Sequence, residues 1–296
     1  MKLVAKFNLV LIGVCSIGLA VAGYLSYNIL QKNAREEVIQ HAGMMMEAAL
    51  AIRSYTVGEI KPLLSLQMTR GFLPQSVPAY AATQSFEKLR KNHPEYSYKE
   101  ATLNPTNPRN RAADWESDIV QTFRNDPDQK QITGVRDTPI GRLLYMARPI
   151  QVKNSGCLNC HSTVQAAPKT MLARYGEANG FGWKLNEVVG AQIVNVPMDY
   201  PIEKARHAFI TFMGSLGGIF LFIIIVLNVM LRAIVIRPVT KLAEISDQIS
   251  MGNMDADEFN ESGNDEISVL GAAFNRMRRS LGKAMNMLEE QETRLL

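Results

Sequence analysis

Two cysteines and a histidine near the middle of the chain have the spacing of a covalent haem site. Cys157, Cys160 and His161 form a C-x-x-C-H motif within the sequence SGCLNCHSTVQAAP. In such a motif the two thiols add across the two vinyl groups of haem, and the adjacent histidine becomes the proximal ligand of the iron. The motif occurs once, which predicts one covalently bound haem c.

Three other kinds of site also use closely spaced cysteines. A disulfide between Cys157 and Cys160 would close a very tight loop. A thioredoxin-like dithiol would open a helix, and the following STVQAAP segment does not have a helical pattern. A zinc site usually needs four ligands, whereas the only other cysteine is Cys15, inside an uncharged stretch. We therefore favour haem over these three alternatives.

Two long stretches without charged residues predict transmembrane helices. They cover residues 7–31 and 208–231, and each exceeds the roughly 20 residues that a helix needs to cross a bilayer. Residues 220–226 are apolar on every face, which disfavours a buried core helix. The small residues at 20–22 would permit cleavage of the first stretch, but it is longer than the apolar region of a signal peptide. We expect an uncleaved anchor.

The basic residues beside these stretches predict their orientation. Lys2 and Lys6 precede the first stretch, and Arg232, Arg237 and Lys241 follow the second. Because Lys and Arg are enriched on the cytoplasmic side, both termini are expected in the cytoplasm of a bacterium. The intervening segment would then lie in the periplasm, beyond the inner membrane. The net charge of +4 is small and dispersed, so no nucleic-acid partner is expected.

The segment between the two anchors has a mixed α+β pattern. Helix-forming residues continue from the first anchor until Pro62, and a second helical run covers Ala112–Phe123. Residues 141–152 have strand character, and residues 180–198 are typical of a turn followed by another strand. We expect a small α+β domain in which the C-x-x-C-H motif directly follows a strand.

The sixth ligand of the iron stays open at this stage. Histidines, methionines, a tyrosine or water are all chemically suitable, and Tyr80, Met45 and Met68 are the candidates that we carry forward. Arg53 is a candidate partner for a haem propionate. No acid–base pair is apparent near the motif, so no enzymatic activity is predicted.

The chain after the second anchor predicts a coiled-coil dimer. Two stretches, at about 239–251 and 266–288, carry apolar residues at spacings of three and four, and a polar connector joins them. Two short amphipathic helices cannot bury their apolar stripes alone, which favours a homodimer with a parallel four-helix bundle. The segment resembles the HAMP signal-relay domain, in which a proline opens the first helix and an Asp-Glu pair opens the second. Here these residues are Pro238, Asp265 and Glu266.

The outer segment resembles a family of bacterial periplasmic proteins with a single c-type haem in a PAS-like domain. The residues that carry the resemblance are RSYT (53–56), KPLL (61–64), VPAYAA (77–82), YKEATLNPTNPRNRAADWE (98–116), CLNCH (157–161) and GFGWKLNEVVGAQIVNVPM (180–198). The resemblance implies a PAS-like fold, with haem on Cys157 and Cys160 and with His161 as proximal ligand. Some relatives resemble a sensor with a distal cysteine, which this outer segment lacks.

These patterns together predict a cytoplasmic N-terminus (1–6), a first transmembrane helix (7–31), a periplasmic haem domain (32–206), a second transmembrane helix (208–231), HAMP (234–287) and a tail (288–296). The layout predicts a membrane-bound haem sensor that passes a periplasmic redox or ligand state to a cytoplasmic signalling partner. The alternative is a membrane-anchored electron-transfer cytochrome with a periplasmic redox partner. That alternative does not explain the HAMP segment.

Overall fold

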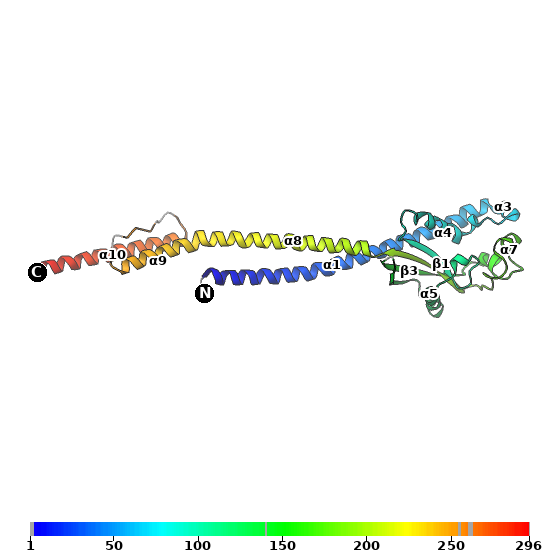
Figure 1. Ribbon diagram of the computed structural model, residues 1–296, viewed down its shortest axis with the longest axis horizontal. Helices are drawn as coiled ribbons and strands as arrows, with labels where there is room; N and C mark the ends of the chain where they lie inside the picture. Colours follow the sequence, from blue (N-terminus) through cyan, green and yellow to red (C-terminus); the bar gives the residue numbers. More distant parts are fainter. Residues whose placement is uncertain (1–2, 140, 254–255, 260–262, 296) are drawn as a thin grey trace. The chain divides into compact units, whose positions relative to one another are not determined.

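The computed structural model describes residues 3–139, 141–253, 256–259 and 263–295. The chain divides into two compact units (Figure 1). One consists of Leu25–Ile210, and the other combines Met1–Tyr24 with Thr211–Leu296.

A four-stranded antiparallel sheet organises the first unit. Its strands are β1 (Ser97–Thr102), β2 (Ile132–Thr138), β3 (Gly141–Gln151) and β4 (Val188–Pro197), in the order β1-β4-β3-β2. The central strands β3 and β4 agree with the two strands expected from the sequence, and the α+β class is confirmed. The edge strands carry more polar residues and were not predicted.

Helices account for most of the remaining described chain. The long ones are α1 (Leu3–Tyr55), α8 (Asp199–Met230) and α10 (Glu266–Leu295). Those of intermediate length are α4 (Pro78–Leu89), α5 (Asp114–Asn125) and α9 (Arg237–Ser250). The short ones are η1 (Thr56–Ile60), α2 (Lys61–Leu63), α3 (Ser65–Arg70), η2 (Pro74–Ser76), η3 (Pro108–Asn110), η4 (Ser155–Cys157), α6 (Leu158–His161), α7 (Lys169–Tyr175) and η5 (Leu231–Ile236).

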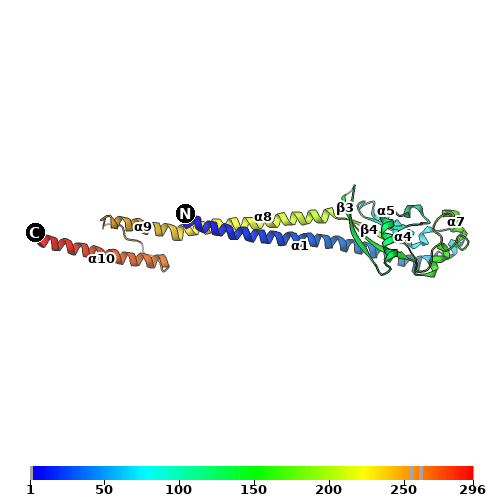
Figure 2. The same cartoon turned by 90° about the horizontal axis from the view of Figure 1, so that it is seen from below.

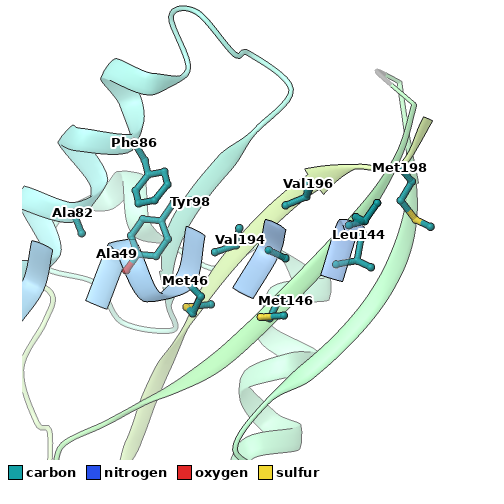
Figure 3. Packing of buried hydrophobic residues seen from close by; sticks show 12 residues of the cluster. Met46, Ala49, Ala82, Phe86, Tyr98, Leu144, Met146, Val194, Val196 and Met198 are labelled. Atoms are coloured by element: carbon teal, nitrogen blue, oxygen red, sulfur yellow. The ribbon is translucent and has the colours of Figure 1, made fainter. Parts of the chain in front are cut away.

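The outer part of α1 packs on one face of the sheet. Its buried residues are spaced by three and four positions, as a helix that rests on a sheet requires, and they are Ala34, Val38, Ala42, Met46 and Ala49. Figure 3 shows Met46 near the strand residues Met146 and Val194, and Ala49 near Tyr98 of β1. Helix α4 completes this layer with Phe86, whose ring centroid lies 5.0 Å from that of Tyr98.

Helix α5 covers the opposite face of the sheet (Figure 1). Val120 and Phe123 pack there against Ala147 and Ile193. Successive strand residues point to opposite faces, so Met146 contributes to the α1 side while Ala147 contributes to the α5 side. The sheet is therefore covered by helices on both faces, which gives the loops at its ends a fixed support.

Two helices of the described chain are long and apolar enough to cross a membrane. They start at Leu3 and Asp199. Their most apolar segments have mean hydropathies of 2.2 and 2.9, and none of the residues in these segments is buried. In the second unit these helices contact each other antiparallel: a Cβ on Gly18 would lie 3.9 Å from Phe220, and one on Gly23 would lie 3.4 Å from Met213. Glycines allow such close packing between membrane helices.

One pair of polar side chains joins the two membrane helices. The Asn8 amide donates to Asn228 Oδ1 at 2.8 Å, and the Asn228 amide donates to Asn8 Oδ1 at 2.7 Å. We expect Asn8→Leu or Asn228→Leu to weaken the packing of the helices by about 1 kcal/mol, since such bonds contribute roughly 0.6–1.7 kcal/mol in membranes.

A double-mutant cycle on thermal unfolding in detergent measures this pairing. A coupling energy of zero between Asn8→Leu and Asn228→Leu would contradict the pairing. Ser215→Ala is the control, because its hydroxyl donates only within α8, to the carbonyl of Phe212.

The HAMP segment forms the two helices expected from its apolar spacing. Helices α9 and α10 run in the same direction (Figures 1 and 2), and Ile245, Ile249 and Phe274 are buried between them with Phe259 of the connector. The Asn275 side chain holds this connector by accepting from the Phe259 N–H and donating to its carbonyl. Within the described residues, α9 and α10 of one copy of the chain thus already pack against each other.

Candidate functional site

A short helical turn presents the three motif residues together. The Asn154 side chain accepts from the Gly156 N–H at 2.7 Å and starts the turn formed by η4 and α6, immediately after β3. Residues three and four positions apart lie on the same side of a helical turn. Cys157, Cys160 and His161 have this spacing, so their side chains share one side.

Both motif cysteines are free thiols. Cys157 is exposed and Cys160 is partly buried. Burial raises the pKa of the Cys160 thiol, while the ammonium group of Lys61 opposes this rise. Lys61 belongs to α2, so the turn after α1 lies close enough to the motif to act on Cys160 electrostatically. The thiols are available for bond formation.

The His161 ring is held in a defined tautomer. Its Nδ1 lies 2.7 Å from the carbonyl oxygen of Gly180. A carbonyl only accepts, so Nδ1 carries the proton and Nε2 keeps its lone pair. Burial lowers the pKa of His161, although the bond to Gly180 opposes this. The imidazole is therefore neutral near pH 7 and its Nε2 can bind a metal.

The segment that holds His161 is residues 180–183, called the proximal loop below. It pairs with the motif through its backbone: the Trp183 N–H donates to the His161 carbonyl and the Gly182 N–H donates to the Ser162 carbonyl. Gly180 has φ +91°, which favours glycine. A Cβ there would also collide with the Thr106 side chain.

The indole of Trp183 stacks on the His161 ring. The ring centroids are 3.9 Å apart and the planes differ by 11°. Stacking on one face and the hydrogen bond at Nδ1 together restrict rotation of the imidazole. A ligand that is fixed in this way loses little conformational freedom on binding iron.

The donor set fits haem better than a bare metal ion. Within the described residues no group of three or more His, Cys, Asp and Glu side chains is placed to hold a metal, as a structural zinc site would require. Two free thiols three positions apart and a neutral imidazole with an available Nε2 suit covalent haem. The residues that would hold it are Cys157, Cys160 and His161.

Arg53 is bound to a carboxylate of the sheet. Its guanidinium lies 2.5 Å from both oxygens of Glu100, which also accepts from the Tyr98 hydroxyl at 2.8 Å. Gln192 in turn donates to the Tyr98 oxygen at 3.0 Å. Although burial lowers the pKa of Arg53, Glu100 raises it above its ordinary value. In this arrangement Arg53 ties the end of α1 to the sheet, and its pairing with a propionate stays a prediction.

The three candidates for the sixth ligand lie in different surroundings. Met45 belongs to α1 and packs, partly buried, against the hydrophobic cluster between α1 and the sheet. The Met68 sulfur accepts from the Leu73 N–H and the Ser76 hydroxyl. The guanidinium carbon of Arg109 lies over the Tyr80 ring, 5.1 Å from the ring centroid. None of these contacts assigns the sixth ligand, which stays a prediction.

Sequence reasoning assigned no role to the two residues that contact the His161 ring. Gly180 and Trp183 lie outside the motif in sequence, and the fold brings them beside it. The signal that was available is the glycine-rich GFGW run at 180–183, because glycines before an aromatic residue are typical of a tight turn with a close backbone approach.

Comparison with known proteins identifies both parts of the chain. The sequence model of the Tll0287-like family, described as Tll0287, matches residues 31–197, which is more than half of the chain. The chain belongs to the Tll0287-like family. A HAMP domain model matches residues 230–283. The match to the Tll0287-like family includes Cys157, Cys160, His161 and the proximal loop.

The chain is also similar to a solved structure, that of the cyanobacterial haem protein Tll0287. It is 17% identical, with a TM-score of 0.42, and the match covers 54% of this chain and 95% of that one. The comparison with curated proteins gives no match.

Proposed function

We propose that the chain is a membrane-bound sensor with one haem c on Cys157 and Cys160 and with His161 as the proximal ligand. The observation that carries the proposal is the geometry of His161, whose Nδ1 lies 2.7 Å from the Gly180 carbonyl oxygen. This leaves Nε2 for a metal, and Cys157 and Cys160 lie in the same turn. When bound, the haem supplies an iron that changes oxidation state or exchanges its sixth ligand. The match to the Tll0287-like family supports this cofactor.

The continuity of the family domain with both membrane helices supports coupling between them. The family match begins at residue 31, within α1, and the outer half of α1 is buried on the sheet. Strand β4 leads directly into α8, which continues through η5 to α9 of HAMP. A shift of the sheet domain would therefore reach HAMP through continuous helix. The architecture favours a sensor over an enzyme, in an inner membrane with the haem domain in the periplasm.

The apolar residues of α10 support a homodimer. Leu270, Met277, Leu281 and Met285 are 44–60% exposed in one chain and follow each other at spacings of seven, four and four. A second copy would cover them in a four-helix bundle. The output would pass from this bundle to a cytoplasmic partner.

Crosslinking between the copies tests the sensor. Leu270→Cys in a Cys15→Ala background is treated with a bifunctional maleimide, with the haem oxidised or reduced. We expect the crosslinking rate to change by about fivefold or more, because coupling between sites is typically 1–3 kcal/mol. Lys283→Cys lies on the opposite side of α10 and is expected to crosslink weakly in both states.

A second control removes the cofactor. Cys157→Ala/Cys160→Ala cannot form thioether bonds, so haem staining on a denaturing gel should disappear and crosslinking through Leu270→Cys should ignore the redox state. If the haem-loaded Leu270→Cys protein crosslinks at the same rate with oxidised and with reduced haem, the proposed signal relay through HAMP is wrong.

That result would favour the second candidate, electron transfer. Trp183 supports it, because an indole stacked on the proximal ligand and only partly buried offers electrons a path between the surface and the site.

A further inference from the structure

We propose that Asn104 is a positioning residue that sets the redox potential of the site through the proximal loop. The inference rests on the proposed function, since it assigns a regulator of the same haem site. Asn104 follows β1, 57 positions before His161 in the sequence, and its side chain is exposed. It contacts the loop and not the histidine.

The Asn104 side chain bonds to two points of the proximal loop. Its Oδ1 accepts from the Gly180 N–H at 3.2 Å, and its Nδ2 donates to the Phe181 carbonyl at 3.3 Å. The Gly180 N–H belongs to the peptide between residues 179 and 180, and the Phe181 carbonyl belongs to the peptide between residues 181 and 182. The Gly180–Phe181 peptide lies between these two. The carbonyl of that middle peptide is the one that accepts from His161 Nδ1. By fixing both neighbours, Asn104 fixes the direction of this carbonyl.

Gly180 needs such a clamp. Its φ of +91° lies where glycine moves freely, so the backbone alone does not hold the carbonyl in place. On the other side it packs against Thr106, whose hydroxyl oxygen is buried without a hydrogen-bond partner among the described residues. Thr106 therefore limits the position of Gly180 by contact, and Asn104 supplies its directional bonds.

The chemical consequence follows from the His161 hydrogen bond. An acceptor at Nδ1 makes the imidazole a stronger electron donor at Nε2, which stabilises oxidised iron over reduced iron. If Asn104 is removed, the Gly180 carbonyl turns away and this donation weakens. We expect Asn104→Ala to raise the ratio of reduced to oxidised haem at a fixed potential by about tenfold, equivalent to about 59 mV.

The experiment is a redox titration of the full-length protein in detergent, with resonance Raman detection of the iron–histidine stretch. Asn104→Ala should raise the midpoint potential and lower the stretching frequency. Asn104→Gln keeps an amide and should fall between Asn104→Ala and the native protein, and it supplies the test if the alanine variant does not retain haem. Asn107→Ala is the matched control, because Asn107 lies in the same loop and accepts only from the Arg109 N–H.

The outcomes separate this inference from the proposed function. Covalent haem with unchanged potential and stretch in both Asn104 variants overturns the inference and leaves the function standing. An equal change in Asn107→Ala also overturns it, because the loop as a whole would then be responsible. A native protein without covalent haem overturns both.

Discussion

Replacing Arg53 with methionine is expected to lower the free energy of unfolding of the sheet domain by about 3–5 kcal/mol, because it leaves a buried carboxylate without its cation. The Glu100 side chain is 4% exposed and that of Arg53 is 24% exposed. The Tyr98 hydroxyl would still donate to Glu100, but a neutral donor does not compensate the charge. Since Arg53 is in the last turns of α1, the loss should appear where that helix meets the sheet.

Amide hydrogen exchange on the full-length protein measures this loss locally. Exchange of the amides of β1 and β4 should accelerate by about two to four orders of magnitude. Arg206→Met is the matched control: Arg206 pairs with Glu203 in the same unit, but their side chains are 62% and 55% exposed, so a change within about 0.5 kcal/mol is expected.

The double variant Arg53→Met/Glu100→Gln separates the charge from the packing. It removes both charges and keeps an acceptor for Tyr98, so at least half of the loss should be recovered. If Arg53→Met costs less than about 1 kcal/mol, the Glu100 carboxylate does not depend on Arg53 and the link between α1 and the sheet is packing alone.

The sequence allowed those parts of the fold to be predicted that depend on local periodicity. The strands at 141–151 and 188–197, the helix from Asp114 and both HAMP helices follow from apolar spacing. Strand β1 was missed because its sequence is SYKEAT. Its charged residues are satisfied by partners that only the fold supplies: Glu100 by Arg53, and Lys99 by Glu116.

The candidate site divides in the same way. The spacing of Cys157, Cys160 and His161 is local, so the sequence contains it. The contacts of His161 with Gly180 and Trp183 are long-range, and no pattern within a window around the motif indicates them. The sixth ligand depends on the opposite side of the iron, for which no local spacing exists.

The dimer prediction gives the largest expected effect on assembly. Met277→Lys should weaken association of two copies by about three orders of magnitude. Burying one such side chain contributes roughly 2 kcal/mol, and a symmetric dimer loses two of them, about 4 kcal/mol in all. Met277 is 60% exposed in one chain, so the substitution should leave the fold of each copy intact. Light scattering of the detergent-solubilised protein measures the change.

Asn286→Lys is the matched control, because it places the same lysine on the opposite side of α10. Asn286 is nine positions after Met277, which is half a turn away on a helix of 3.6 residues per turn. We expect this variant to remain dimeric. If both lysine variants dimerise equally, the stripe through Met277 does not form the interface, and the exposed apolar residues of α10 must meet another partner. If both are monomeric, added charge on α10 is responsible and not the burial of Met277. Only a loss confined to Met277→Lys supports a bundle in which two copies bring their α10 stripes together, as transmission of a signal through HAMP requires.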